Sequence, residues 1–432
     1  MIEKEPLILS NEFNEIIELF ESSKDNYFLT GRAGTGKSTL LQLFKNTTKK
    51  NVIVLAPTGI AALNVGGQTI HSFFGLPPRI ISVHDIPKRT KKFRSLYEKI
   101  DTIVIDEISM VRADLLDNID ASLRINRQGK EHLPFGGVQV IFFGDMFQLP
   151  PVVSSMEEKA YFNSHYQSPY FFSSAILKSN FKIQVIELTK VYRQEETFFL
   201  KFLDRVRTNQ VDYEDLLDIN KRHITSFDSD DLYVTLTTTN AISEQINQQK
   251  LNGINNPEVV FSGSVSGSFD TMYYPTDLNL RLKLGAQILF LKNDVKKRYV
   301  NGTIAKIVEL TPNKIVAQTT EGNLVEVSKF EWEIKKYILD EKNPQIINSE
   351  VIGTFSQYPI KLAWAMTIHK SQGKTFDKVI IDLGRGAFEF GQTYVALSRC
   401  RTLEGIILKR PINFKDIFVD ERIVSYYETY LR

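Results

Sequence analysis

The sequence has a single cysteine and no long hydrophobic run, which argues against a disulfide-stabilised protein and against a membrane-spanning one. Cys400 stands alone among 432 residues, so no intramolecular disulfide can form, which suits a reducing compartment. No stretch approaches the roughly 18 apolar residues of a membrane-spanning helix. Residues 1–5, Met-Ile-Glu-Lys-Glu, resemble neither a signal nor a transit peptide. We therefore expect a soluble, cytoplasmic protein with no membrane partner.

The chain also has little net charge, which limits how it can hold a polyanion. Its 53 Lys and Arg nearly balance its 51 Asp and Glu, for a net charge of +2. A nucleic acid would therefore be held by local basic patches and not by a bulk field. Basic runs are present at residues 88–94 and 296–298. Each run could bind phosphates or could simply form a solvated surface, and the sequence favours neither alternative.

Apolar runs that alternate with helical patterns predict parallel sheets in an α/β fold. The runs are nearly unbroken, as is typical of strands covered by helices on both faces. Strands are expected at residues 27–29, 52–55, 102–105, 138–143, 232–236, 379–382 and 406–408, with helices at 113–127, 240–251 and 393–397. Asn240 would cap the second of these helices. We predict two domains, at residues 1–190 and 191–432.

Two insertions interrupt this alternation. Residues 66–87 form a loop-rich stretch in the first domain. In the second domain, residues from about 285 to 358 are β-rich, with hairpin signals at Asn301-Gly302 and at residues 321–323. We predict a small, all-β, barrel-like insertion there.

Residues 31–39 form a phosphate-binding loop between an expected strand and an expected helix. Their sequence, Gly-Arg-Ala-Gly-Thr-Gly-Lys-Ser-Thr, fits the pattern G-x-x-x-x-G-K-[ST]. Glycines let several backbone N–H groups face one anion, and the helix N-terminus adds partial positive charge. Lys37 would reach the β- and γ-phosphates, and Ser38 would ligate Mg²⁺. The residues expected to contact a nucleoside triphosphate are Gly34, Thr35, Gly36, Lys37, Ser38 and Thr39.

Two acids and an amide follow later strands and complete the predicted site. Asp106 would hold Mg²⁺ and Glu107 would activate the attacking water. Neighbours at a strand end point in different directions, which suits two separate roles. This pair favours hydrolysis over transfer to an acceptor. Gln148 would contact the γ-phosphate or the water, although a glutamine in a proline-stiffened surface turn is the alternative reading.

These motifs, in this order, resemble those of superfamily-1 helicases. The segments that carry the resemblance are 31–39, 56–62, 68–73, 106–110, 144–151, 188–194, 365–375 and 391–401. Residues 109–128 further resemble the signature helix of the petite-integration-frequency (Pif) family of superfamily 1B. The resemblance implies two RecA-like domains with ATP between them and an SH3-like insertion in the second. It also implies 5′→3′ translocation on single-stranded DNA with duplex unwinding, in replication, repair or telomere maintenance.

The resemblance assigns further residues to the nucleotide. Arg193 and Arg399 match positions of cationic fingers that reach the γ-phosphate from the second domain, where such a charge stabilises the transition state. Gly373 falls in a motif that contacts the nucleotide. Phe13 departs from the family pattern, because a glutamine that reads adenine is expected there.

A groove for single-stranded DNA is implied as well. The matching positions are Thr58 and His71 in the first domain and Thr239, Asn240 and His369 in the second. Phe73 would press on bases at the fork, with core packing as the alternative. Expected partners are single-stranded, forked or tailed DNA and G-quadruplexes, bound by a monomer or two copies. A translocase that strips proteins from DNA and a catalytically silent DNA-binding subunit stay open as alternatives. We expect a bacterial, phage or mobile-element protein associated with the nucleoid.

Overall fold

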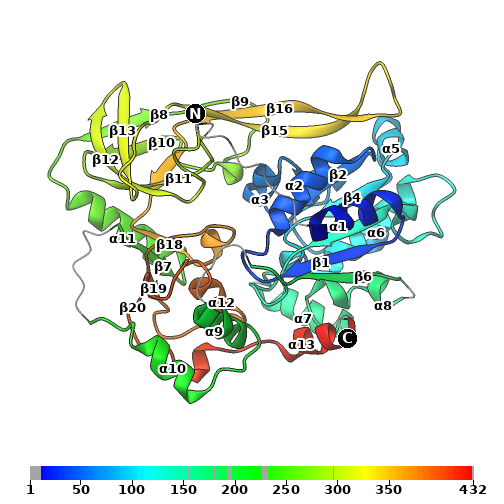
Figure 1. Cartoon of the computed structure of the whole chain (residues 1–432). Coiled ribbons are helices and arrows are strands. Elements are labelled where there is room, and N and C mark those ends of the chain that lie inside the picture. The colour runs from blue at the N-terminus through cyan, green and yellow to red at the C-terminus, as the bar shows by residue number, and fades with distance from the viewer. Residues whose placement is uncertain are drawn as a thin grey trace.

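The computed structural model describes residues 11–153, 155–179, 181–191, 197–225, 232–294 and 296–430. Its first domain is built on a six-stranded sheet whose pairings are all parallel (Figure 1). In spatial order the strands are β3 (Gln68–Thr69), β2 (Val52–Ala56), β4 (Thr102–Ile105), β5 (Gln139–Phe143), β1 (Tyr27–Gly31) and β6 (Gln184–Leu188). The predicted parallel sheet is confirmed.

Helices cover both faces of this sheet, which explains its unbroken apolar strands. Within β1, Phe28 packs into one hydrophobic cluster and its neighbours Tyr27 and Leu29 into another, as strand alternation requires. The side of Tyr27 is covered by α1 (Asn11–Ser22), α2 (Lys37–Thr47) and α3 (Gly59–Val65). The opposite side is covered by α4 (Ile70–Phe74), α5 (Lys91–Glu98), α6 (Ala113–Asn126) and α8 (Ala175–Lys178). Helix α7 (Met156–His165) contacts the start of α6, where Glu158 pairs with Arg112 at 2.9 Å.

The stretch at residues 66–87 is less loop-rich than predicted. It contains β3, which pairs with β2 at the edge of the sheet, and all of α4. Thr69 caps α4 by accepting a hydrogen bond from Ser72 N. This insertion therefore belongs to the core of the first domain.

The second domain contains a four-stranded sheet that is also parallel. Its strands are β18 (Ala365–Thr367), β7 (Val234–Thr237), β19 (Val379–Asp382) and β20 (Ile406–Leu408). Its helices are α9 (Thr197–Arg207), α10 (Tyr213–Asn220), α11 (Asn240–Asn252) and α12 (Gln392–Leu397). The cap of α11 is Thr239, which accepts from Ile242 N, so the prediction of Asn240 as the cap was wrong by one residue. In the described residues, no helix combines the length and apolarity needed to cross a bilayer.

Antiparallel strands lie between α11 and β18, and they begin earlier than residue 285, at β8. A five-stranded sheet consists of β14 (Leu324–Glu326), β13 (Lys314–Thr319), β12 (Ile304–Thr311), β11 (Gln287–Phe290) and β17 (Ile360–Leu362). A two-stranded sheet pairs β10 (Asn279–Lys283) with β8 (Glu258–Ser262), and a three-stranded sheet holds β15 (Phe330–Leu339), β16 (Ile347–Gln357) and β9 (Ser264–Gly267).

The turn at 321–323 joins β13 and β14 as expected. Asn301-Gly302 instead turns within a longer loop between β11 and β12, where Gly302 has φ +101°. The domain boundaries themselves stay predictions.

The long β15–β16 hairpin leaves this region and lies against the first domain (Figure 1). The Tyr337 hydroxyl accepts a hydrogen bond from Val54 N at 3.1 Å, and its ring packs edge-on against Phe73 with centroids 5.9 Å apart. At the hairpin tip, Asn51 Nδ2 donates to Gln345 O at 2.8 Å. The antiparallel region thus touches both parallel-sheet domains.

The last helix, α13 (Glu421–Tyr430), also crosses between domains, because it packs on the first one (Figure 1). The Tyr427 ring stacks on Phe147 with centroids 4.9 Å apart, and its hydroxyl lies 2.5 Å from the buried hydroxyl of Thr30 in β1. Tyr426 stacks on Phe172 at 4.7 Å. The chain therefore returns to its first domain after completing the second.

Replacement of Tyr427 by Phe should lower the free energy of unfolding by about 1–3 kcal/mol, because the buried Thr30 hydroxyl loses its partner while the ring packing stays. Urea denaturation followed by fluorescence measures this. Tyr430→Phe is the matched control, since Tyr430 is 46% exposed and should change stability by less than about 0.5 kcal/mol. Equal midpoints for Tyr427→Phe and the unaltered protein would contradict the expectation.

Candidate nucleotide site and domain interface

Strands β1, β4 and β5 run parallel and end at one edge of the first sheet, where open α/β sheets place their ligands. A pocket of about 330 Å³ lies at this edge. It is lined by Ala33, Gly34, Thr35, Gly36, Lys37, Ser38, Thr39, Glu107, Gln148, Gly373 and Arg399. The structure therefore brings most of the predicted nucleotide residues together from both domains. Arg193 lies outside the described residues.

The phosphate-binding loop has the backbone that its glycines predict. Gly34 and Gly36 have φ of +87° and +88°, values that favour glycine, and Gly36 leads directly into α2. Lys37 Nζ donates to the carbonyl oxygens of Gly31 at 2.6 Å and Arg32 at 3.0 Å. Ser38 is exposed in the first turn of the helix. The ammonium and the hydroxyl are thus both held at the pocket.

Phe13 lies beneath this loop. Its ring is buried in the core between α1 and α2, and a Cβ at Gly36 would come within 2.8 Å of Phe13 Cζ. An aromatic ring there supports the loop by packing, whereas an amide would offer hydrogen bonds.

Asp106 and Glu107 both lie beyond the end of β4. The strand ends at Ile105, and Glu107 adopts a left-handed conformation with φ +51°, so strand alternation does not apply to these two residues as predicted. Burial raises the pKa of both carboxyl groups, and the nearby Lys37 ammonium opposes that rise in each. Arg399 also opposes it at Glu107. The two acids therefore share one cationic environment.

Arg399 belongs to the second domain but its charge reaches the nucleotide pocket. The side chain is only 1% exposed. Its Nε donates to Val395 O at 3.0 Å and its Nη2 to Ser398 Oγ at 2.8 Å, so the end of α12 holds the guanidinium. Burial lowers the pKa of Arg399, and the charge of Glu107 acts in the opposite direction.

Asp145 is the centre of a polar network that residue patterns did not reveal. Its carboxylate is completely buried and accepts from Arg207 Nη2 at 3.2 Å, from the Tyr394 hydroxyl at 3.3 Å and from Gln148 Nε2 at 3.3 Å. The Tyr394 hydroxyl in turn accepts from Ala33 N at 3.1 Å. The network joins the phosphate-binding loop to α9 and α12. Asp145 stood in a quoted motif, whereas nothing in the sequence marked Arg207.

Gln148 is positioned by the same network and does not lie in a surface turn. It is 7% exposed and lines the pocket. Its Oε1 accepts from Gln372 Nε2 of the second domain at 3.4 Å. The amide therefore contacts polar groups of both domains beside the phosphate-binding loop.

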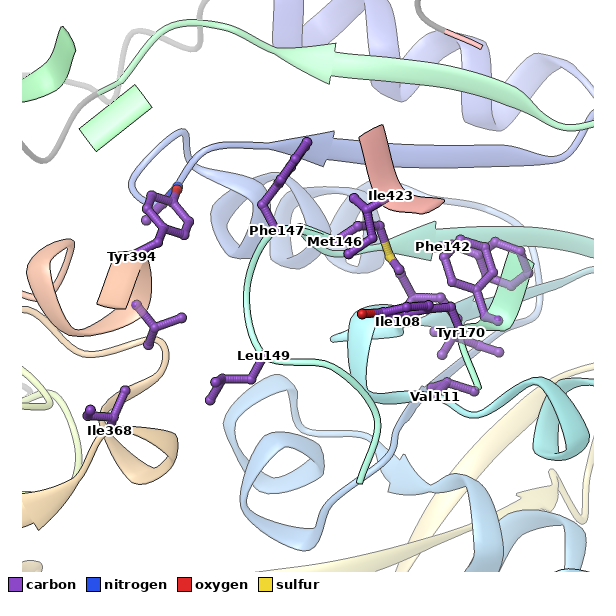
Figure 2. Close-up of a cluster of buried hydrophobic side chains, with 14 of the residues drawn as sticks. Ile108, Val111, Phe142, Met146, Phe147, Leu149, Tyr170, Ile368, Tyr394 and Ile423 are labelled. Atoms are coloured by element: carbon purple, nitrogen blue, oxygen red, sulfur yellow. The ribbon is translucent and has the colours of Figure 1, made fainter. Parts of the chain in front are cut away.

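Apolar packing surrounds these polar contacts. Figure 2 shows Phe147 and Leu149 on the segment that follows β5, between the first-domain side chain Tyr170 and the second-domain residues Ile368 and Tyr394. Gly391 lies so close to this segment that a Cβ would come within 2.3 Å of Phe147 O. Both domains therefore share one hydrophobic cluster at their junction.

The predicted DNA residues differ in how far they are accessible. Thr58 and Thr239 are exposed caps of α3 and α11, and Asn240 is exposed beside the latter. His71 and His369 are partly buried, which lowers the pKa of each imidazole.

Phe73 was wrongly predicted to contact bases. Its side chain is 3% exposed and stacks on Tyr97 with centroids 5.4 Å apart. Because α4 turns this ring into the core of the first domain, it is not presented to DNA.

Two parallel-sheet domains that share a pocket at a phosphate-binding loop define a two-domain P-loop protein. A profile of the PIF1-like helicases matches residues 9–216. The ATP-dependent DNA helicase Pif1 of Bdellovibrio bacteriovorus is 34% identical, with 98% of this chain and 92% of the relative aligned. The chain belongs to the Pif1 helicase family. It spans 61% of the length of the human ATP-dependent DNA helicase PIF1, which is also 34% identical.

Solved structures of Pif1 from Bacteroides sp. resemble the chain to different degrees. The unliganded protein, 38% identical, matches with a TM-score of 0.90 over 99% of this chain and 98% of that one. The structure of the same relative bound to single-stranded DNA is also 38% identical and aligns over 99% of this chain and 98% of that one, but its TM-score is only 0.70. The present arrangement of domains is therefore closer to that of the unliganded relative.

Substitution of Asp145 by Asn should lower the free energy of unfolding by about 3 kcal/mol, because it removes the carboxylate closest to the buried Arg207 guanidinium and leaves the Glu187 carboxylate, 3.7 Å away, as its counter-charge. Asp204→Asn is the matched control. Its carboxylate pairs with Arg32 at 3.0 Å, but both side chains are more than a third exposed, so about 0–1 kcal/mol is expected. Thermal unfolding measures both losses, and equal losses would contradict a special role for the buried pair.

Proposed function

We propose that this ATP-dependent DNA helicase moves 5′→3′ along single-stranded DNA and separates duplexes ahead of it, with ATP hydrolysed between its two domains. The observation that carries the proposal is that Arg399 and Gly373 of the second domain line the same pocket as Lys37. Nucleotide bound there would touch both domains at once. Hydrolysis would then alter how the domains hold each other and the DNA.

The chain offers the groups that a triphosphate with Mg²⁺ requires. Lys37 would exchange its two carbonyl partners for the β- and γ-phosphates. Ser38 and Asp106 would hold Mg²⁺, which needs few protein ligands because it keeps several waters. The raised pKa of Asp106 fits a carboxyl group that a cation would stabilise as the anion. When bound, the metal neutralises charge on the phosphates.

Other residues would act on the water and on the developing charge. Glu107 would accept a proton from the attacking water, and Gln148 would orient that water. Arg399 would stabilise negative charge at the γ-phosphate, with Arg193 as its predicted companion. Because the Arg399 guanidinium is held by α12, its distance from the phosphate depends on closure of the cleft.

DNA would lie along Thr58, His71, Thr239, Asn240 and His369. The drop in TM-score for the DNA-bound Bacteroides relative supports a rearrangement of domains when DNA binds. We further propose forked duplexes and G-quadruplexes as substrates, action as a monomer or as two copies, and a nucleoid-associated location in a bacterial cytoplasm. The intact pocket argues against a catalytically silent subunit.

Strand separation on duplexes that carry a 5′ tail, a 3′ tail or no tail tests the polarity. We expect ATP-dependent unwinding from the 5′ tail alone, and none for Lys37→Ala because phosphate binding is lost. Unwinding only from the 3′ tail would overturn the direction. Equal unwinding by Lys37→Ala would overturn the mechanism, and DNA-stimulated ATPase without unwinding would favour the protein-stripping translocase.

Glu107→Gln should reduce the ATPase kcat by about 10²–10⁴-fold while nucleotide still binds, because the amide cannot accept the proton. Steady-state hydrolysis and binding of a fluorescent ATP analogue measure the two effects. Glu214→Gln on the exposed face of α10 is the matched control and should leave both unchanged. A Glu107→Gln protein with full turnover would remove Glu107 from the reaction.

A further inference from the structure

Tyr394 is a second-domain residue that forms a hydrogen bond with the backbone of the phosphate-binding loop. Its ring extends from α12 toward the loop that follows β1 (Figure 2). The hydroxyl accepts from Ala33 N at 3.1 Å and donates to Asp145 Oδ2 at 3.3 Å. Burial and the charge of Asp145 raise the pKa of this hydroxyl, so it stays protonated at neutral pH. Its single proton therefore goes to the carboxylate, and a lone pair is left for the loop.

The peptide group between Arg32 and Ala33 is held at both of its ends. The Arg32 carbonyl accepts from Lys37 Nζ and from Thr35 Oγ1, each at 3.0 Å. The N–H of the same peptide belongs to Ala33 and is the group that Tyr394 binds. Ala33 lines the nucleotide pocket, yet its N–H is turned toward the second domain. The orientation of this peptide therefore depends on groups from both domains.

The loop already has its phosphate-binding backbone in the absence of nucleotide, with positive φ at Gly34 and Gly36. A loop held in its binding conformation loses less conformational entropy when the ligand arrives. The hydrogen bond from Ala33 is one of the contacts that hold it, and it is buried. A buried N–H that loses its acceptor is unfavourable, so without the hydroxyl the loop would shift to find another partner.

The helix that carries Tyr394 also holds Arg399. The carbonyl of Val395, the residue after Tyr394, accepts from Arg399 Nε at 3.0 Å. At the start of the helix, Gly391 lies directly against Phe147 of the first domain. A movement of α12 would therefore displace the Tyr394 hydroxyl and the Arg399 guanidinium together.

We propose that Tyr394 is a positioning residue for the phosphate-binding loop: its hydroxyl holds the Arg32–Ala33 peptide from the second domain and so keeps the loop ready for nucleotide. The inference deepens the proposed function and rests on it, because it concerns the same pocket. Tyr394 acts through the loop and does not touch the reacting atoms.

This role makes nucleotide affinity depend on the position of the second domain. DNA is proposed to contact that domain at Thr239, Asn240 and His369, so its binding would alter the hydrogen bond between Tyr394 and Ala33. Such coupling is reciprocal, since nucleotide must change the affinity for DNA by the same factor. Loss of the hydroxyl should therefore reduce the factor by which DNA changes nucleotide affinity.

Tyr394→Phe removes the hydroxyl and keeps the ring. Titration with a fluorescent, non-hydrolysable ATP analogue and Mg²⁺ should show a Kd about five- to tenfold higher than that of the unaltered protein, the effect of one lost hydrogen bond. At saturating ATP and DNA, kcat should change by less than about threefold, because Arg399 keeps its contacts with α12. The ratio of Kd values without and with oligodeoxythymidine should move closer to one.

Tyr427→Phe is the matched control, because it also removes a buried hydroxyl at the domain junction but one that meets the Thr30 side chain and not the loop backbone. It should lose stability and retain the nucleotide Kd within about twofold. An equal rise in Kd in both variants would overturn the inference, since general loosening of the junction would explain it. An unchanged or lower Kd in folded Tyr394→Phe would also overturn it.

Hydrogen exchange of the unaltered protein tests the same contact without a substitution, and it carries the test if Tyr394→Phe does not fold. The Ala33 amide should be protected in the free protein, and its exchange rate should change when oligodeoxythymidine binds. The same exchange rate with and without DNA would overturn the inference. Absence of nucleotide binding by the unaltered protein would overturn the proposed function instead.

Discussion

The buried carboxylate of Asp145 is the group on which the rest of the domain junction depends. It stands at the end of β5 and receives hydrogen bonds from α9, through Arg207, and from α12, through Tyr394. A charge removed from water must keep all of its partners, so their positions are fixed as a set. Tyr394 extends the set to Ala33 in the phosphate-binding loop, and Gln148 extends it to the pocket. Movement of either domain would disturb the groups that meet the nucleotide.

Two segments from late in the sequence also contact the first domain and strengthen this junction. The β15–β16 hairpin brings Tyr337 to the edge of the first sheet, and α13 brings Tyr427 to β1. Neither contact follows from the order of strands and helices, because each joins residues hundreds of positions apart. The hairpin, α13 and the network around Asp145 therefore all hold the second domain against the first. An opening of the groove has to release the contacts made by the hairpin or those near Asp145.

In the nucleotide pocket, cations and acids compensate one another, with Lys37 and Arg399 near Glu107. This arrangement suits a ligand that arrives with its own metal. The overall charge of the chain, which is near zero, does not reveal it, because only local geometry brings these opposite charges together.

The sequence by itself determined the two parallel sheets, the phosphate-binding loop and the acids of the site, because these depend on local patterns: apolar strands, glycine spacing and residues at strand ends. Only the tertiary structure decided which side chains those patterns leave in the core. Phe73 was predicted to contact bases but packs against Tyr97 in the core, and Glu107 lies in a left-handed turn beyond the strand from which its direction was predicted. Likewise Arg207 belongs to no motif. Its burial and the carboxylates of Asp145 and Glu187 define its chemistry, and these distant segments become neighbours only once the chain has folded.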